Sequence, residues 1–173
     1  MREQGGQHRK LLEQCTECGK CCTGAGEVWI DSAEAAAMAQ RLELDTPTFL
    51  EKYTKDYTRR QGWYFLKTRP GDVDGACIFL EPDSNLCRVH DVRPLMCKTY
   101  PWWPALVDED TWQQEKRETC EGFDHEDAPP QDVDHALRML QESRAYVARR
   151  ERAPLAKKVK KRAAAASKGF GGR

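Results

Sequence analysis

Four cysteines stand within eight consecutive residues, Cys15-Thr16-Glu17-Cys18-Gly19-Lys20-Cys21-Cys22. Thiolates this close together repel one another, and cysteines so near in sequence cannot pair as disulfides without strain. A soft cation shared among the sulfurs removes both problems, because thiolate sulfur is a preferred ligand of zinc and of iron-sulfur clusters. The CxxCxxCC spacing therefore predicts a metal-binding site, and the rest of the fold must accommodate it.

Four further cysteines follow in the sequence, and the first three stand at equal ten-residue intervals. Eight thiols are enough for two four-sulfur sites, or for one cluster and one closed structural site. Disulfides are the alternative that an even count permits. No apolar signal segment precedes the cluster, however, and a chain without a leader stays where thiols are kept reduced. The expected metal ligands are Cys15, Cys18, Cys21, Cys22, Cys77, Cys87, Cys97 and Cys120.

The identity of the metal stays open between an iron-sulfur cluster and zinc. A CxxCxxC run is the spacing that wraps a 4Fe-4S cubane, whose fourth thiolate comes from elsewhere in the chain. Zinc sites more often use two separated CxxC pairs, yet eight thiolates also divide into two tetrahedral zinc sites. His90 lies three residues after Cys87 and is a candidate ligand of a mixed site. The N-terminal spacing slightly favours iron.

A thin apolar core makes a metal staple structurally useful in this chain. Hydrophobic residues make up 39% of the 173 residues and charged residues 32%, with a mean hydropathy of −0.80. Small folds with little apolar content are commonly stabilised by bound metal. We therefore expect a small α+β domain that is irregular and metal-stapled. No membrane span is expected, because the sequence holds no run of about 18 apolar residues.

The local pattern predicts a helical pair, a short hairpin and a C-terminal amphipathic helix. Asp31 and Glu34 form a capping-box pattern before an alanine-rich run, and Pro47 suits the first turn of the next helix. Turn-forming residues separate the two arms of the hairpin. The expected elements are strands over 27–30 and 63–66, helices over 31–42 and 46–53, hairpin arms 77–80 and 86–89, a helical turn over 93–98, and a helix from 132 with an apolar stripe of Val133, Leu137, Leu140 and Val147.

Charge is distributed unevenly along a chain whose formal net charge is zero. From Arg149 to the C-terminus there are ten Lys or Arg against one Glu, which gives +9 and leaves −9 for residues 1–148. We divide the chain into a flexible N-terminus (1–14), a cysteine-cluster metal-binding domain (15–130), an amphipathic helix docked on it (131–153) and a basic tail (154–173) that we expect to be disordered. The tail is a candidate contact for nucleic acid or an acidic protein partner.

Several motifs together resemble the YkgJ-type CxxCxxCC family over about residues 15–125. They are CxxCGKCC at 15–22, Cys77-Ile78-Phe79-Leu80, the segment from Cys87 to Cys97 with Arg93-Pro94, Tyr100-Pro101-Trp102-Trp103-Pro104 and Cys120-Glu121-Gly122. The resemblance implies zinc or iron chelation, or iron-sulfur binding, and no established reaction. One relative of that family, flagellin lysine-N-methylase, carries a similar cysteine cluster in a much longer chain.

Three classes of function stay open on the sequence. The first is a metal-binding protein with a metal-handling, cluster-carrier or redox role. The second is a nucleic-acid or ribosome-associated protein in which zinc is structural and the basic tail makes the contact. The third is a methylase-like enzyme; the sequence offers no Gly-rich cofactor loop and no distinctive Ser/His/Asp spacing, so we lean against an enzyme and assign no catalytic residue.

A cytoplasmic protein is expected, or one of an organelle stroma or matrix if the source is eukaryotic, and not a secreted one.

Overall fold

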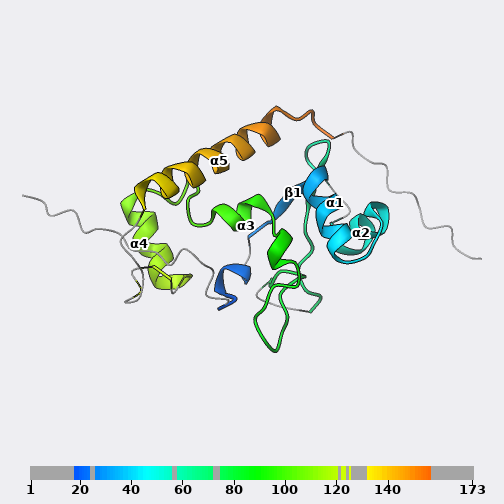
Figure 1. Cartoon of the computed structure of the whole chain (residues 1–173), viewed down its shortest axis with the longest axis horizontal. Coiled ribbons are helices and arrows are strands. Elements are labelled where there is room, and N and C mark those ends of the chain that lie inside the picture. Colours follow the sequence, from blue (N-terminus) through cyan, green and yellow to red (C-terminus); the bar gives the residue numbers. More distant parts are fainter. Residues whose placement is uncertain are drawn as a thin grey trace, which may run out of the picture.

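The computed structural model describes residues 18–23, 26–55, 58–71, 75–120, 122–123, 125 and 132–156. In Figure 1 the long helix α5 runs along one side of the molecule, with α1 and α2 toward one end, α4 toward the other and α3 between them. In chain order the elements are η1 Lys20–Cys22, β1 Trp29–Asp31, α1 Ser32–Arg41, α2 Thr46–Tyr53, β2 Trp63–Phe65, η2 His90–Val92, α3 Leu95–Thr99, α4 Glu109–Glu118 and α5 Val133–Arg152.

The predicted helical pair is confirmed, and each helix begins at an aspartate cap. The Asp31 carboxylate accepts the backbone N–H groups of Ala33 and Glu34, and the Glu34 side chain accepts the Asp31 N–H at 2.9 Å. Before α2, Asp45 accepts the Thr48 N–H at 2.9 Å. Both caps satisfy backbone donors that a helix start leaves unpaired, which is why these local patterns fix the helix boundaries.

The two expected strands pair as an antiparallel two-stranded sheet, β1 with β2, with Ile30 opposite Tyr64. Ile30 is buried on one face of this short sheet and Trp63 and Phe65 are buried on the other, so both faces pack against the rest of the chain. Together with the helices, the sheet confirms the small α+β class. None of the helices in the described ranges is both long enough and apolar enough to span a bilayer.

The hairpin expected over residues 77–89 is present, but without regular strands. Its arms are joined by one isolated antiparallel bridge, Leu80 with Cys87. Each arm bends at its cysteine, because the Leu80 N–H donates to the Cys77 carbonyl at 3.0 Å and the His90 N–H donates to the Cys87 carbonyl at 3.1 Å. A tight turn that starts at each cysteine stops the arms from extending into a regular ladder and keeps both cysteines beside the core.

Buried side chains form two separate clusters in the described residues, and cysteines border both. The first cluster lies around α1, α2 and the hairpin and includes Phe49 and Phe79, with Cys77 and Cys87 packed at its edge. The second lies around α4 and the first half of α5; its buried members are Trp102, Trp112, Phe123 and Ala136, and Cys120 packs at its edge. The thin core is therefore divided, and its two parts need ties between them.

Helix α5 is present and Asp132 caps it, but the predicted apolar stripe is wrong over its first half. Val133 is 63% exposed and Leu137 is 50% exposed. The buried positions are instead Ala136, Ser143 and Tyr146. Small side chains let the helix approach its neighbours closely, and the tyrosine hydroxyl has specific acceptors, so hydrophobicity alone identified the wrong face.

Sequence reasoning also missed α4, whose composition is strongly polar. Its start has a clear local signal, because the Asp108 carboxylate accepts the Thr111 backbone N–H at 3.0 Å. One apolar residue anchors the helix: Trp112 is fully buried, with its ring centroid 4.4 Å from that of Phe123. A capping residue followed by a single large aromatic was the available signal.

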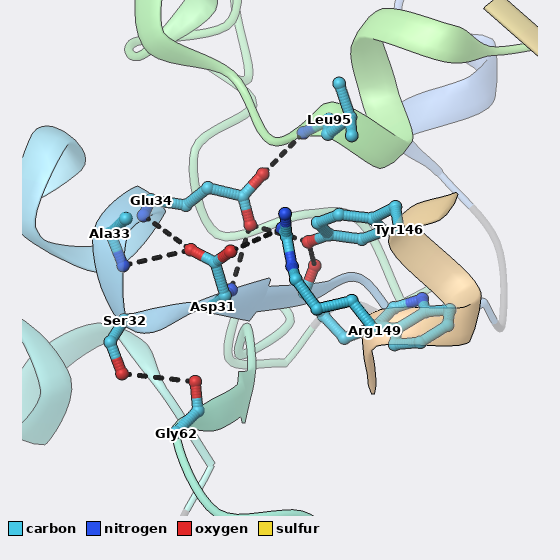
Figure 2. Close-up of polar contacts among 9 residues, drawn as sticks. Asp31, Ser32, Ala33, Glu34, Gly62, Leu95, Tyr146 and Arg149 are labelled. Carbon is cyan, nitrogen blue, oxygen red and sulfur yellow. Dashed lines mark hydrogen bonds and ion pairs between the residues drawn. The ribbon is translucent and has the colours of Figure 1, made fainter. Parts of the chain in front are cut away.

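One carboxylate, Glu34, joins three helices (Figure 2). Its Oε1 accepts the Leu95 N–H at 2.7 Å, at the start of α3, and its Oε2 lies 2.5 Å from the Tyr146 hydroxyl of α5. The same hydroxyl lies 3.0 Å from the Trp29 carbonyl oxygen of β1. Arg149, one turn further along α5, binds the Asp31 carboxylate at 2.6 Å. This network positions α3, which carries Cys97, relative to the sheet and to α5.

Replacing Tyr146 by phenylalanine should destabilise the fold by about 2 kcal/mol, because a partly buried carboxylate would lose a charge-assisted donor. The free energy of unfolding from urea titration measures this. Tyr64→Phe is the matched control, since Tyr64 is a partly buried tyrosine of β2 that lies outside the network, and it should cost under about 0.5 kcal/mol. Equal losses in both variants would contradict the role given to Glu34.

Candidate metal centre

Seven of the eight predicted ligands lie in the described part of the chain, and no disulfide links any of these seven. Cys15 lies outside the described residues, so its role stays a prediction. Cys18, Cys21 and Cys22 come from the segment at η1, and Cys97 comes from α3. Cys77 and Cys87 come from the hairpin, and Cys120 comes from the second position after α4. Four separate segments therefore contribute thiols.

The N-terminal cysteine segment is fastened to the hairpin by backbone contacts. The Cys77 N–H donates to the Cys22 carbonyl at 2.8 Å. Gly19 adopts φ +76°, a left-handed conformation that favours glycine, and a Cβ built there would stand 3.1 Å from the Asn85 Cβ. A larger residue at position 19 would therefore be strained and would push against the hairpin loop. These contacts bring Cys22 beside Cys77 across more than fifty residues of sequence.

Four thiols from these segments interact electrostatically. The pKa of Cys97 is raised, chiefly by desolvation even though the residue keeps an exposed surface, and the charges of Cys77, Cys22 and Cys87 raise it further. Repulsion of this kind requires the sulfurs to share one region. We call Cys22, Cys77, Cys87 and Cys97 the hairpin thiol group.

The Cys77 sulfur has a backbone donor and a cation beside it, which suit a thiolate. Burial raises its pKa to about 11, while the Phe79 backbone N–H donates to the sulfur and the Arg69 guanidinium favours the charged form. Arg93 likewise acts on Cys97 to lower its pKa. Backbone N–H donors and nearby cations are the partners that stabilise metal-bound thiolates. Sequence reasoning gave no role to Arg69 or to the Phe79 N–H.

Cys22 behaves differently from its three partners. Its pKa is lowered to about 7, chiefly by a hydrogen bond from the Cys21 side chain, against an opposing effect of burial. Neighbouring cysteines in η1 therefore support one thiolate near neutral pH. A thiolate already formed is the species that a soft metal ion binds.

Cys21 and Cys120 lie near Tyr100, which packs against the second core. Tyr100, whose hydroxyl donates to Glu115 Oε1 at 2.5 Å, has its pKa raised by burial, by Glu115 and, to a smaller degree, by the charges of Cys120 and Cys21. Cys120 and Cys21 thus lie in the surroundings of one tyrosine, although they are about a hundred residues apart in sequence. Among the described cysteines, the hairpin thiol group therefore shares one region, and Cys21 and Cys120 share the surroundings of Tyr100.

His90 begins η2, and its ring is engaged by a neighbour. The Arg93 Nη1 lies 3.0 Å from His90 Nε2 and also donates to the His90 carbonyl at 3.1 Å. The prediction that His90 takes part in a mixed metal site stays a prediction.

Within the described ranges, no three His, Cys, Asp or Glu side chains are arranged to hold a metal ion as they stand. The hairpin thiol group thus shares a region without forming a ready coordination shell. What fits a thiophilic metal here is the chemistry of the donors: converging sulfurs, a backbone N–H donor to one of them and two flanking guanidinium groups.

Comparison with known proteins gives a match to one family and to a curated relative. The family model described as "CxxCxxCC: Putative zinc- or iron-chelating domain" matches residues 14–121, which is more than half of the chain. A curated protein of Methanocaldococcus jannaschii, "Uncharacterized protein MJ0661", is 30% identical over 92 residues, covering 53% of this chain and 46% of that protein. The chain therefore spans about half the length of this relative. No solved structure matches the chain.

In the reduced, metal-free protein, alkylation at pH 7.5 should modify Cys22 more than tenfold faster than Cys77. With a pKa of about 7, Cys22 is mostly thiolate at that pH, whereas Cys77, at about 11, is almost entirely thiol. Mass spectrometry of peptides after timed iodoacetamide treatment measures both rates. The Cys21→Ala substitution removes the hydrogen-bond donor and should slow Cys22 alkylation severalfold. A Cys22 rate that rises only above pH 9 would contradict the assignment.

Proposed function

This chain belongs to the family of zinc- or iron-chelating CxxCxxCC domains, and on that premise we propose that its cysteines form the metal site. The family match supports metal binding in general. The ligand set that we propose is all eight cysteines, from Cys15 to Cys120. The observation that supports it best is the gathering of Cys22, Cys77, Cys87 and Cys97 from three distant segments into one electrostatically coupled group.

We further divide the ligands into two sites. The hairpin thiol group holds one metal ion or cluster beside the first core. Cys15, Cys18, Cys21 and Cys120 hold a second one toward the core around Trp112. The division is supported by the packing of Cys77 and Cys87 on one core and of Cys120 on the other. It is also supported by the separate surroundings of Cys97 and Tyr100.

The described residues have distinct roles around the first site. Arg69 and Arg93 offset the negative charge that four thiolates would place there, and the Phe79 N–H orients the Cys77 sulfur. The Cys77 N–H bond to the Cys22 carbonyl fixes the N-terminal ligand against the hairpin. Bound zinc would supply a structural cross-link, and a bound iron-sulfur cluster would supply an electron-transfer centre.

The biological role that follows is a metal-handling, cluster-carrier or redox function, with the thiolates as the working groups. A reducing compartment such as the cytoplasm suits a protein that depends on unoxidised thiols. We assign no catalytic residue, because among the described residues the polar groups that converge most closely, around Glu34, are used to join helices.

Anaerobic purification followed by elemental analysis and an absorption spectrum should find zinc or iron bound to the full chain. We expect Cys97→Ala to lose the metal of the first site and to retain that of the second, and Cys120→Ala to show the reverse. Ser84→Ala, at an exposed position in the hairpin loop, is the control and should keep the full metal content. Unchanged metal content in both cysteine variants would overturn the proposal.

Removing the metal should destabilise the cysteine-bearing part strongly, since a structural zinc contributes on the order of 10 kcal/mol to folding in small domains. Circular dichroism and thermal melting before and after chelation measure the effect, and re-addition of the same metal should restore the melting temperature. The metal would be shown to have no structural role if chelation removed it without changing the melting curve.

A further inference from the structure

Four arginines crowd onto one surface at the C-terminal end of α5. Arg149 and Arg150 belong to the last turns of α5, and Arg59 and Arg60 belong to the loop that leads into β2. We call these four residues the arginine surface. The pKa of Arg150 is lowered by desolvation and then by the charges of Arg59 and Arg60. Positive charges held this close repel one another in the free protein. An anion bound between them would attract all of them and offset that repulsion.

Aromatic rings of the sheet and of α5 hold these guanidinium groups in place. The Arg150 Cζ lies 3.8 Å from the centroid of the Trp29 ring, the Arg59 Cζ 5.6 Å from Phe65, and the Arg149 Cζ 5.2 Å from Tyr146. Phe65 and Tyr146 are buried, so the rings cannot move away. A guanidinium held over a ring loses less conformational freedom when it binds a ligand.

The carboxylates near the arginine surface do not neutralise it. Glu27 lies 3.8 Å from the Arg59 Nη2 and is shared with Lys55. Asp31 binds Arg149 but is also the cap of α1. Within the described part of the chain, Arg150 makes no ion pair, and its buried Nε has no hydrogen-bond acceptor. The side chains of Arg59 and Arg149 are 66% and 56% exposed, so the positive charge is accessible.

More positive charge follows directly in the sequence. The Ala156 N–H donates to the Arg59 carbonyl at 3.2 Å, and the Gln61 N–H donates to the Pro154 carbonyl at 2.9 Å. The backbone of residues 154–156 is thus paired beside the arginine surface. The 17 residues that follow, 157–173, contain seven Lys or Arg and no Asp or Glu.

We propose that the arginine surface binds the phosphate backbone of a single-stranded nucleic acid. The planar guanidinium fork matches a phosphate, and the Arg59 guanidinium, held over the Phe65 ring with its side chain 66% exposed, is accessible for stacking on an unpaired base. This stacking favours nucleic acid over an acidic peptide or an anionic lipid, which need only charge. Binding should be independent of base sequence, because contacts to the phosphate backbone carry no sequence information.

The test uses the metal-loaded full chain and a fluorescent oligouridylate of about 20 nucleotides, long enough to span such a surface. The Arg59→Ala/Arg150→Ala variant is compared with Arg138→Ala/Arg144→Ala, which removes the same charge from exposed positions elsewhere on α5. We expect the first variant to bind about tenfold more weakly and to lower the slope of log K against log salt by about one. The control should bind within about twofold of the wild type.

Equal weakening in both variants would overturn the proposal, because net charge alone would then explain binding. Metal content and melting temperature verify that the variants are folded. If the double variant does not fold, Arg59→Ala alone, at a mostly exposed side chain, should still weaken binding about threefold. A chain ending at Ala156 should retain weaker, Arg59-dependent binding. Tighter binding of polyglutamate or of phosphatidylserine vesicles than of the oligonucleotide would also overturn the proposal.

Discussion

Repulsion among closely spaced sulfurs is the constraint on which the rest of this structure depends. Cys22, Cys77, Cys87 and Cys97 come from η1, the hairpin and α3, and the charges of the other three raise the pKa of Cys97. The fold brings Cys77 and Cys97 to the group as thiols, because as thiolates the four groups would repel one another. A shared cation would stabilise the thiolates and offset that repulsion, so under our proposal a chain with a thin, divided core gains stability from bound metal.

The remaining elements hold the thiol-bearing segments in place. The hydrogen bond from Cys77 N–H to the Cys22 carbonyl and the close approach of Gly19 to Asn85 attach the N-terminal segment. Glu34 receives the first backbone N–H of α3 and the Tyr146 hydroxyl, so α3 is fixed to α1 and α5. The Trp29 N–H also donates to the Met96 Sδ at 3.4 Å, one residue before Cys97. Sheet, helices and thiols are thus directly connected.

Local signals made most of the helices and strands predictable. Aspartate caps at Asp31, Asp45 and Asp132 mark helix starts because the chemistry is complete within three residues. The buried face of α5 was not predictable in this way, since Ala136 and Ser143 are buried by close approach and not by hydrophobicity. The sequence predicted that the N-terminal cysteines lie beside the later ones, but not that Cys22 in particular meets Cys77, because a backbone contact between distant segments decides that. The cysteines themselves were named from spacing alone, while Arg69 and the Phe79 N–H carry no sequence signal of their own.

X-ray absorption at the edge of the bound metal tests the central claim most directly. The account predicts a first shell made of sulfur, at about 2.3 Å if the metal is zinc. In Cys97→Ser, the number of sulfur neighbours per bound metal ion should fall, or the metal of that site should be lost. A shell dominated by nitrogen or oxygen, or a spectrum unchanged by this substitution with the metal content intact, would contradict a metal centre built on the hairpin thiol group.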